Sequence, residues 1–498
     1  MPAGHREVET KYDVADDVAL PEVADLPGVE RVEGPHTFLL EARYFDTDDL
    51  ALARRGITLR RRAGGEDEGW HLKLPVSGAR QEIQAALGRS TRTPPLALRR
   101  VVQGVVRDRP LAPVATVVTE RTMASLMDAD ESVLAEICDD RVVATRTGPD
   151  GDEEHSWREW EVEVHAARPR LLKALRTRLR KQGAHVSTAT SKFGRLLQID
   201  AEAPSHDRRS VPSRATEHEL LTGYVASLTV DLHRLDPLAR ADLPDAVHQL
   251  RLVFRRLRAA LTTFDASFDT TVTGPVREEL RWIGDILGRP RDLEVLQSRL
   301  SALVLAQPPR LVRGRPGPWI DGRLRPARRS AHKQVLEAMA TERYFSLVDT
   351  LDSWQAGPPW SARRDRRARQ GLPKVLRHEW ERVERAVAKA DTADDTERPE
   401  LLHQVRNAAK RARYTAEVLR PVLGTEARDI AKAAKRIQPS LGAHHDTLVA
   451  VDQVLLLADA ARDDGRDTFT YGVLTTRLEA ALAEHEGTFR RTWKKVRR

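Results

Sequence analysis

Two segments of the chain carry basic residues at the same helical spacing. The first set is His248, Arg251, Arg255 and Arg258, and the second set is His403, Arg406, Lys410 and Arg413. Intervals of three and four residues place each set in one narrow stripe of an α-helix. Like charges at these intervals repel each other by roughly 0.2 to 0.5 kcal/mol per pair. A chain that repeats this cost in two places is expected to bind an anionic partner there.

An apolar stripe accompanies each basic stripe at the same offset. Its members are Val247, Leu250, Phe254, Leu257 and Leu261 in the first segment, and Leu402, Val405, Ala409, Ala412 and Ala416 in the second. Each segment is therefore predicted to pack on one face and to expose cations on the neighbouring face. A solvated basic surface is the alternative for either segment alone, and the duplication argues against it.

A second motif recurs behind each basic stripe. Residues 287–292 read LGRPRD and begin 39 residues after the first histidine, and residues 441–446 read LGAHHD and begin 38 residues after the second. A repeat of this length indicates two related helical bundles rather than a short solenoid unit. The repeat adds Arg291 and His445 to the candidate anion ligands.

The histidines of these segments admit other roles. His248 and His403 could be buried side chains that hydrogen-bond to a backbone carbonyl, but their register with the cations favours hydrogen bonds to phosphate. The run of His444, His445 and Asp446 suggests a metal site, yet adjacent helical residues point about 100° apart and chelate poorly together. The repeat also places Arg291 where His445 lies, which favours an anion over a metal.

Charged residues also alternate along predicted strands in the first 200 residues. The sets that share one strand face are Glu7, Glu9 and Lys11; Arg60 and Arg62; His71 and Lys73; and Glu161 and Glu163. Mg²⁺ typically binds one or two carboxylates together with substrate phosphates. Inside a barrel, charges of both signs would cost stability unless a metal ion and a polyanion occupied the lumen. The pattern therefore predicts a triphosphate site that uses a divalent cation.

The periodicity of the whole chain predicts strands first and helices afterwards. Expected strands are residues 7–12, 38–45, 57–62, 70–74, 117–121, 133–137 and 160–165, and expected helices among them are 50–55 and 168–182. The polar, proline-containing stretch 201–215 is expected to be an interdomain linker. From residue 216 onward the pattern is helical, with a second break at 306–330.

The predicted fold class is multidomain α+β. Residues 1–200 would form an antiparallel β-barrel, or tunnel, with helices packed on it. Residues 216–498 would form an all-α domain of two pseudo-symmetric bundles, at about 216–305 and 331–498.

Composition limits the class of protein. A chain of 498 residues is long enough for two to four domains, and 40% hydrophobic with 31% charged residues fits a globular protein. The sequence has no apolar run of about 20 residues and no signal peptide at its start, so we expect a cytoplasmic protein without a membrane partner. Cys138 is the only cysteine, which excludes an intrachain disulfide and a thiolate metal cluster. The 82 basic and 74 acidic residues nearly balance, so opposite charges must be sorted onto different surfaces.

The first 200 residues resemble the CYTH domain, the triphosphate tunnel metalloenzyme fold. The resemblance rests on the segments EVETK at 7–11, YFDT at 44–47 followed by 50–62, WEVEV at 160–164 and SKFGR at 191–195. In that family an eight-stranded antiparallel barrel forms a tunnel, in which basic residues grip a triphosphate and carboxylates bind Mg²⁺ or Mn²⁺.

This resemblance implies roles for individual residues. The implied metal ligands are Glu7, Glu9, Glu161 and Glu163, with Asp139 as a further acidic member. The implied phosphate ligands are Lys11, Arg60, Arg62, Lys73, Arg121 and Lys192. The catalytic group would be Glu7, Glu9 and Lys11 with a bound Mg²⁺ or Mn²⁺.

Residues 216–498 resemble the CHAD domain, a histidine-containing, basic, α-helical module that often follows a CYTH domain. The resemblance rests on VHQLR at 247–251 with RRLR at 255–258, and on LHQVR at 402–406 with KRARY at 410–414. CHAD modules are associated with inorganic polyphosphate. The resemblance therefore implies that the two basic stripes, with Arg291 and His445, bind polyphosphate.

The two halves together favour a hydrolase: metal-dependent hydrolysis of inorganic triphosphate or short polyphosphate, beside a polyphosphate-binding module. A non-catalytic polyphosphate-binding protein is a second hypothesis, although pure anion binding gains nothing from four carboxylates. Adenylate cyclisation and thiamine triphosphate hydrolysis in the same barrel remain open. Nucleic acid is disfavoured, because aromatic residues make up only 5% of the chain and the basic stripes lack interleaved stacking residues. The sequence has no Gly-rich phosphate loop, nucleophile elbow or HExxH motif.

Overall fold

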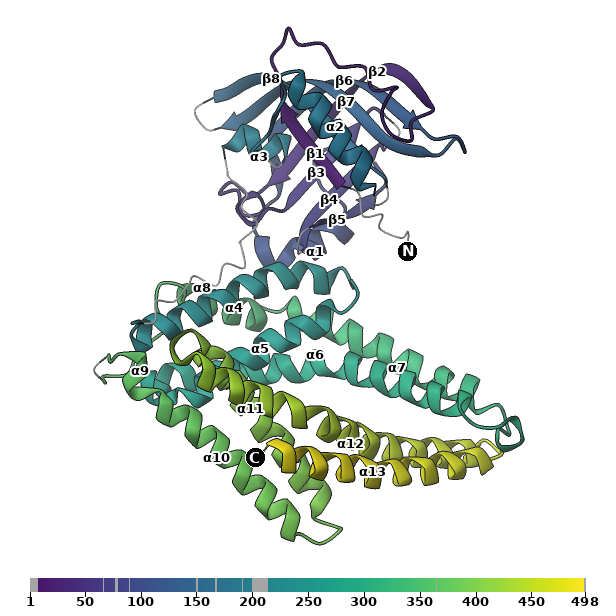
Figure 1. Cartoon of the computed structure of the whole chain (residues 1–498), viewed down its shortest axis with the longest axis vertical. Helices are drawn as coiled ribbons and strands as arrows, with labels where there is room; N and C mark the ends of the chain where they lie inside the picture. Colours follow the sequence, from purple (N-terminus) through teal and green to yellow (C-terminus); the bar gives the residue numbers. More distant parts are fainter. Residues whose placement is uncertain are drawn as a thin grey trace. The chain divides into compact units, whose positions relative to one another are not determined.

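The computed structural model describes residues 8–65, 67–76, 79–88, 90–148, 151–165, 168–189, 191–198, 214–363 and 365–496 (Figure 1). The chain divides into two compact units, one built mainly from residues up to Ser205 and the other mainly from residues after it. Most of the expected linker 201–215 lies outside the described residues. An antiparallel β-sheet unit followed by a helical unit confirms the predicted fold class.

The first unit is built on one antiparallel sheet. Its strands are β1 (Val8–Asp13), β2 (Arg31–Asp46), β3 (Thr58–Ala63), β4 (Gly69–Val76), β5 (Ala79–Ala85), β6 (Ala112–Met127), β7 (Val133–Gly148), β8 (Gly151–Val164) and β9 (His185–Val186). Their order in the sheet is β5-β4-β3-β2-β6-β7-β8-β1-β9, so β5 and β9 are its edges among the described residues. Residues from all of β1 to β8 line a single cavity, which requires the sheet to curl around it.

Helices close this unit and fix its strands. The helix α2 (Pro169–Lys181) begins with a proline, which suits the first helical turn, and buries Leu171, Leu175 and Leu179 against the Trp160 layer of the sheet. Each fully buried leucine contributes about 1.5 to 3 kcal/mol to folding. The short helix α3 (Lys192–Leu197) begins where the Ser191 side chain accepts a hydrogen bond from the Gly194 amide at 2.9 Å. This cap sets the position of Lys192 at the start of the helix.

Several elements differ from expectation. The helix expected at 50–55 is a 3₁₀ turn, η1 (Ala53–Arg55), ended by Gly56 at a φ of 68°. The buried Asp46 carboxylate organises this turn by accepting hydrogen bonds from the Leu52 and Ala53 amides at 2.9 and 2.8 Å. The helix α1 (Leu96–Val106) and strand β5 were not predicted, although α1 buries Leu98, Val101, Val102, Val105 and Val106 at helical spacing, so its signal was present in the sequence.

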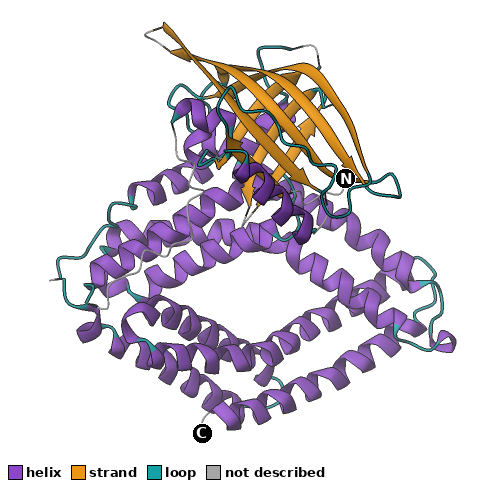
Figure 2. Cartoon of the chain, turned by 45° about the horizontal axis from the view of Figure 1, so that its top comes forward, coloured by secondary structure: helices purple, strands orange, loops and turns teal. Residues whose placement is uncertain are grey.

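The second unit is helical throughout its described part (Figure 2). Its main helices are α4 (Glu217–Arg240), α5 (Ala246–Thr263), α6 (Thr270–Leu305), α7 (Pro316–Met339), α8 (Glu342–Ser353), α10 (Pro373–Thr392), α11 (Arg398–Leu423), α12 (Thr425–Asp463) and α13 (Phe469–Val496); α9 (Ala368–Gly371), η2 (Asp265–Ser267) and η3 (Pro309–Leu311) are short turns. The series α5, α6, α7 and the series α11, α12, α13 repeat the same order of one medium, one very long and one long helix. Within this unit, α5 packs directly against α11.

The expected break at 306–330 is too long. Only residues 306–315 separate α6 from α7, and α7 continues through the proline-rich and arginine-rich remainder. Pro316 lies in the first turn of α7, where a missing amide hydrogen has no cost. Ile320, Leu324 and Ala331 follow at helical spacing and are buried. The burial of this apolar face stabilises a helix here in spite of the prolines. Across the described part of the chain, no helix combines the length and apolar character that crossing a membrane requires.

Candidate functional site

The register of the sheet determines which charged side chains share the cavity. Directly opposite residues of antiparallel strands point to the same face. The opposite pairs on this face are Lys11 and Glu161, Asp140 and Glu159, Arg121 and Asp140, Arg60 and Tyr44, and Lys73 and Glu82. The cavity has a volume of about 560 Å³. The predicted residues that line it are Lys11, Arg60, Arg62, Lys73, Arg121, Glu161, Glu163 and Lys192.

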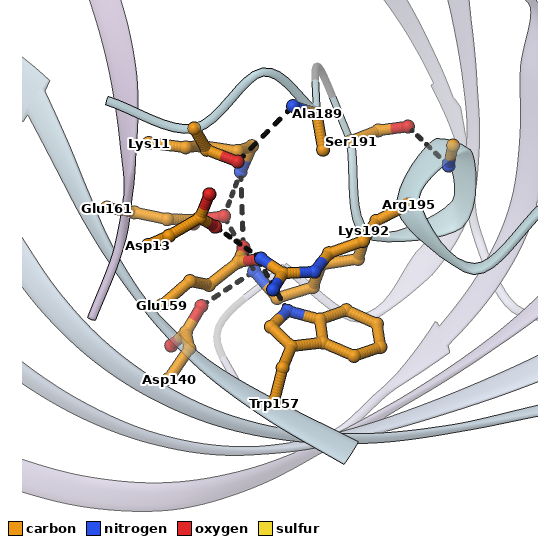
Figure 3. A network of polar contacts seen from close by, with 12 residues as sticks. Lys11, Asp13, Asp140, Trp157, Glu159, Glu161, Ala189, Ser191, Lys192 and Arg195 are labelled. Carbon is orange, nitrogen blue, oxygen red and sulfur yellow. Dashed lines mark hydrogen bonds and ion pairs between the residues drawn. The ribbon is translucent and has the colours of Figure 1, made fainter. Parts of the chain in front are cut away.

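Three carboxylates converge at one side of this cavity (Figure 3). Oxygens of Asp140, Glu159 and Glu161 all lie within 4.8 Å of one another. The Lys192 ammonium lies among them, 2.7 Å from Asp140 Oδ2, 2.8 Å from Glu159 Oε1 and 2.6 Å from Glu161 Oε1. Lys192 is the first residue of α3, so the Ser191 cap described above places a cation at the centre of the cluster.

Two further cations complete the cluster. Arg121 donates to both oxygens of Asp140, at 2.7 and 2.6 Å, and also to Glu161. Lys11 donates to Glu161, and its Nζ lies 3.8 Å from Glu159. Three carboxylates therefore face three cations at the centre of the cluster, and beyond them Arg195 lies 3.9 Å from Glu159 and contacts Asp13.

These ion pairs determine the protonation states of Glu161 and Lys192. Burial is the largest effect on the Glu161 carboxyl and disfavours its charged form, but Lys192, Lys11 and Arg121 together hold its pKa well below the usual range. Burial likewise disfavours charge on Lys192, yet Glu161, Asp140 and Glu159 raise its pKa above the usual value. Glu161 and Lys192 are therefore both ionised at neutral pH, as a site for a metal ion and a polyanion requires.

The carboxylate cluster offers the donor chemistry of a divalent cation site. Its ligand atoms are all carboxylate oxygens, which suit Mg²⁺ and Mn²⁺ better than softer metals. Each of these carboxylates forms an ion pair with Lys11, Lys192 or Arg121. A metal ion bound to the carboxylates would therefore replace these cations as their partner. The donor set therefore fits the metal, provided that the cations can move to another partner.

Asp139 does not belong to this cluster. Alternation along β7 points it away from Asp140, and its carboxylate accepts hydrogen bonds from Arg158 at 2.8 and 2.6 Å. The structure places Asp140, and not Asp139, in this cluster, and the role as metal ligand that the resemblance implied for Asp139 stays a prediction. Glu159 was also missed, although Glu159, Glu161 and Glu163 form an in-phase series that the sequence displays.

Glu7 lies outside the described residues, and so does the side chain of Glu9. The backbone register places Glu9 directly opposite Glu163, which lines the cavity. Their predicted roles as metal ligands stay predictions.

Strands β3 to β5 carry the remaining predicted cations. Lys73 Nζ lies 3.1 Å from Glu82, which also contacts His71, and Arg62 contacts Asp67. Tyr44 stacks on Phe193 with ring centroids 4.5 Å apart. Burial would raise the pKa of Tyr44, but Arg60, Arg62 and Lys192 lower it below its usual value. Tyr44 lines the same cavity as these three cations, so an anionic group bound there would meet a positive field.

The helical unit contains a second basic site, on α5 and α11. Helices α5 and α11 pack directly together, and burial, followed by the charges of neighbouring cations that include Arg251 and Arg255 of α5, lowers the pKa of Arg406 and of Lys410. Cations of the two basic stripes therefore lie near one another where the two helices meet. We call these residues, with the outer members His248, Arg258, His403 and Arg413 and the flanking Arg291 and His445, the basic groove.

Most of the cations at the middle of the groove lack a carboxylate partner. Among the described residues, the structure records no salt bridge for Arg255, Arg406 or Lys410. Other cations of the set do have carboxylate partners: Arg251 lies 2.9 Å from Asp292, Arg291 lies 2.8 Å from Glu294, and Arg413 lies 3.5 Å from Glu417. The groove is thus strongly cationic at its centre.

Glycines of the second repeated motif make room for the arginines. A Cβ at Gly288 would lie 2.5 Å from the Arg251 guanidinium, and a Cβ at Gly442 would lie 3.6 Å from that of Arg406. Each arginine therefore rests on the backbone of the neighbouring long helix, α6 or α12. The close contact requires a glycine at Gly288, whereas at Gly442 a Cβ would make only an ordinary contact.

The histidines differ between the halves. His403 and His445 form a pair with Nδ1 atoms 3.0 Å apart, whereas His248 lies near Arg291. His444 points elsewhere: it is buried, and its Nε2 lies 3.4 Å from Glu486. The adjacent histidines therefore do not chelate together, as their helical spacing predicted.

Comparison with known proteins assigns both units. Residues 5–192 match the CYTH domain and residues 223–455 match the CHAD domain. The uncharacterized protein Rv2226 of Mycobacterium tuberculosis is 37% identical over 97% of this chain and 94% of its own length. Among solved structures, the CHAD domain of the plant Ricinus communis covers 57% of this chain and 93% of its own (21% identity, TM-score 0.45). HpAC1 from Hippeastrum, described as having a dominant triphosphatase activity, covers 39% of this chain and 95% of its own (19% identity, TM-score 0.24).

These matches agree with the geometry of both sites. The CYTH match covers the unit with the curled antiparallel sheet and its charged cavity. The CHAD match covers the helical repeat that carries the two basic stripes. The two domains support a function related to triphosphate compounds. The chain belongs to the CYTH–CHAD fusion proteins.

Proposed function

We propose that the CYTH cavity hydrolyses inorganic triphosphate or short polyphosphate with Mg²⁺ or Mn²⁺, and that the CHAD groove binds polyphosphate. The observation that carries the proposal is the carboxylate cluster, which reaches the cavity through Glu161, beside six predicted phosphate ligands that line the same cavity. A site for an anion alone would need only the cations. Carboxylates at the same place are useful when a metal ion must bind beside the phosphates.

The arrangement of charges suggests how substrate and metal bind together. A triphosphate that enters the cavity offers oxygens to Lys11, Lys192 and Arg121, which in the ligand-free site contact carboxylates. As these cations turn to phosphate, the carboxylates Asp140, Glu159 and Glu161 lose their partners. Phosphate binding thus uncovers the metal ligands, so substrate and metal should bind cooperatively.

The protein's residues would act mainly by position and charge. Phosphoryl transfer needs little covalent chemistry from a protein. Arg60, Arg62 and Lys73 on β3 and β4 would hold the phosphates away from the carboxylates, and Arg121 and Lys192 would neutralise charge nearest to them. A bound Mg²⁺ or Mn²⁺ supplies polarisation of phosphoryl oxygens and activation of water.

The basic groove would hold the polymer. Polyphosphate carries about one charge per phosphate, and the middle of the groove offers cations without recorded carboxylate partners. Binding should be driven by the release of counterions and should weaken steeply with salt.

The deciding experiment measures phosphate release from tripolyphosphate, long polyphosphate, ATP and thiamine triphosphate, with Mg²⁺, with Mn²⁺ and with neither. We expect metal-dependent release from tripolyphosphate that Glu161→Gln abolishes and Glu120→Gln, an exposed carboxylate next to Arg121, leaves intact. Turnover of none of these compounds, in protein that binds polyphosphate, would reduce the chain to a binding protein. Turnover of only ATP or thiamine triphosphate would replace the proposed substrate.

A further inference from the structure

We infer that the basic groove takes up protons when it binds a polyanion, and that the α11–α12 half accepts them, at Lys410 and at the His403–His445 pair. The inference rests on the proposed binding of polyphosphate and adds to it a regulation by pH. It follows from a difference between the two halves of the repeat.

At two positions the repeat places a permanent cation in the first half and a titratable group in the second, whereas the first stripe position is a histidine in both halves, His248 and His403. Arg255 of α5 corresponds to Lys410 of α11, and Arg291 of α6 corresponds to His445 of α12. Arginine stays protonated in proteins, whereas lysine and histidine can release a proton when their surroundings disfavour charge. Only the second half can therefore change its charge at these positions.

The surroundings of Lys410 disfavour its charge. Its side chain is largely buried at the α5–α11 contact, where Arg406 precedes it by one turn and Arg251 and Arg255 face it from α5. Burial, followed by these three arginines, lowers the pKa of Lys410 to about 7, and only Asp446 of α12 opposes the shift. A substantial fraction of Lys410 is therefore neutral at neutral pH when the groove is empty.

The histidine pair holds a second set of proton sites. With Nδ1 atoms 3.0 Å apart, one ring must donate and the other accept, so both rings cannot carry two protons in this geometry. Burial is the largest effect and lowers the pKa of each histidine. Arg406 and Lys410 lower the pKa of His403 further, and Glu400 opposes this shift. The same two cations lower the pKa of His445, and Asp446 opposes that shift.

Other helices around the pair do not supply compensating charge. On α10, Glu379 and Arg382 face Arg411, on the other side of α11. On α13, Glu486 and His485 face His444. On α6, Asp292 contacts Arg251. The phosphates of a ligand would therefore be the main anionic groups that Lys410 meets.

The direction of the effect follows from linkage. Phosphate oxygens favour the charged forms, so the pKa of Lys410 rises from about 7 in the free protein to a higher value in the complex. Affinity then falls as pH rises between those two values, by at most tenfold per unit for each proton. The histidines start below the usual 6.5 and add a second window at lower pH. Binding should be tightest in mildly acidic solution.

The test is calorimetry of the full chain with polyphosphate of one length, without divalent metal and at constant ionic strength. Titrations at pH 7.5 in two buffers of different ionisation enthalpy give the number of protons taken up. We expect roughly 0.5 to 1 proton, and an affinity about four- to tenfold weaker at pH 8.5 than at pH 7. End phosphates of the polymer titrate too, with a pKa near about 6, so the conclusion rests on differences between variants.

The repeat itself supplies the matched variants. Lys410→Arg and His445→Arg each introduce the residue that the first half carries at the same position. Both variants should bind polyphosphate at least as tightly as the original chain. Lys410→Arg should take up fewer protons at pH 7.5, and His445→Arg should take up fewer protons at pH 6.5. Arg329→Lys, an exposed change on α7, should alter neither quantity. Equal proton uptake in the original chain and both groove variants would overturn the inference while leaving polyphosphate binding intact. Absence of binding at any pH would instead overturn the proposed function and this inference together.

Discussion

The cavity of the CYTH domain and the groove of the CHAD domain both gather cations, but they treat them differently. Lys192 lies within 2.8 Å of three carboxylates, and its pKa is raised above the usual value. Lys410 has no recorded salt bridge among the described residues, and its pKa is lowered to about 7. The same side chain is stabilised in its charged form in one domain and destabilised in the other.

This difference separates two ways of binding phosphate. A site with paired charges is stable when empty, and a ligand must exchange one set of partners for another. A site of unpaired cations stores repulsion when empty, and a ligand relieves it. The first arrangement suits chemistry that brings a metal to a substrate, and the second suits retention of a polymer.

The largest expected effect tests the paired site. Asp140→Asn removes a carboxylate that contacts Arg121 and Lys192, so we expect hydrolysis of tripolyphosphate to fall by about 100-fold or more, with a steeper requirement for Mg²⁺. The neighbouring Asp139→Asn should keep most turnover, because Asp139 pairs with Arg158 on the other face of β7. Steady-state rates against metal concentration decide, with thermal melting to confirm that both variants fold. Equal losses would contradict the assignment of Asp140.

The second effect tests the unpaired site. Arg255→Glu introduces a carboxylate opposite Lys410, and we expect polyphosphate affinity to drop about ten- to hundredfold at low salt, with the slope of log K against log salt reduced by about 1 to 2. Arg329→Glu on α7 changes the net charge equally and should cost far less. A similar loss in both variants would reduce the groove to a generic basic surface.

Arg411 is a poor control for that experiment, although it lies outside the stripe. Its Nε lies 2.9 Å from the carboxylate of Glu379, which is only 2% exposed. Reversing its charge would leave Glu379 buried beside another carboxylate and would unfold part of the domain.

A smaller effect concerns stability and should have opposite signs in the two domains. Lys410→Met removes a buried cation from among three arginines, so we expect the free energy of unfolding to rise by about 1 to 2 kcal/mol while polyphosphate affinity falls. Lys192→Met removes the partner of three carboxylates and should lower the free energy of unfolding. Denaturant titrations of the full chain without ligand test both. Destabilisation by Lys410→Met would show that the groove stores no repulsion.

The smallest expected effect comes from substituting Gly288 and Gly442, the glycines that lie next to Arg251 and Arg406. Gly288→Ala should displace the Arg251 guanidinium, since the new Cβ would lie 2.5 Å from it, and weaken polyphosphate binding by about three- to fivefold. Gly442→Ala leaves an ordinary contact of 3.6 Å to Arg406 and should change affinity less than twofold. Parallel binding curves compare the two, and an equal loss would mean that the glycines serve the helices rather than the arginines.

Spacing within a single element allowed much of this molecule to be predicted. The basic stripes, the apolar stripes and the carboxylate series each depend on one helix or strand, where residue intervals determine the shared face. The presence of both domain families and the fold class followed from these motifs and are confirmed.

Features that depend on two elements were harder to predict. The choice between Asp139 and Asp140 depends on the register of β7 against β6 and β8, which a sequence of two adjacent aspartates does not reveal. The pairing of His403 with His445 depends on the packing of α11 on α12. The helix α7 was partly hidden by prolines that its first turn accommodates.

The direct packing of α5 on α11 has a consequence for how the protein is made. His248 and His403 are 155 residues apart in sequence, so the groove closes only after both halves of the helical repeat have been synthesised and have docked. Contacts of such long range form late in folding, because the loop-closure entropy must be overcome first. A polyanion that binds only the docked halves shifts the folding equilibrium towards them by mass action. Polyphosphate would then act as a folding aid for the domain that retains it, and repulsion across an empty groove would keep immature chains open.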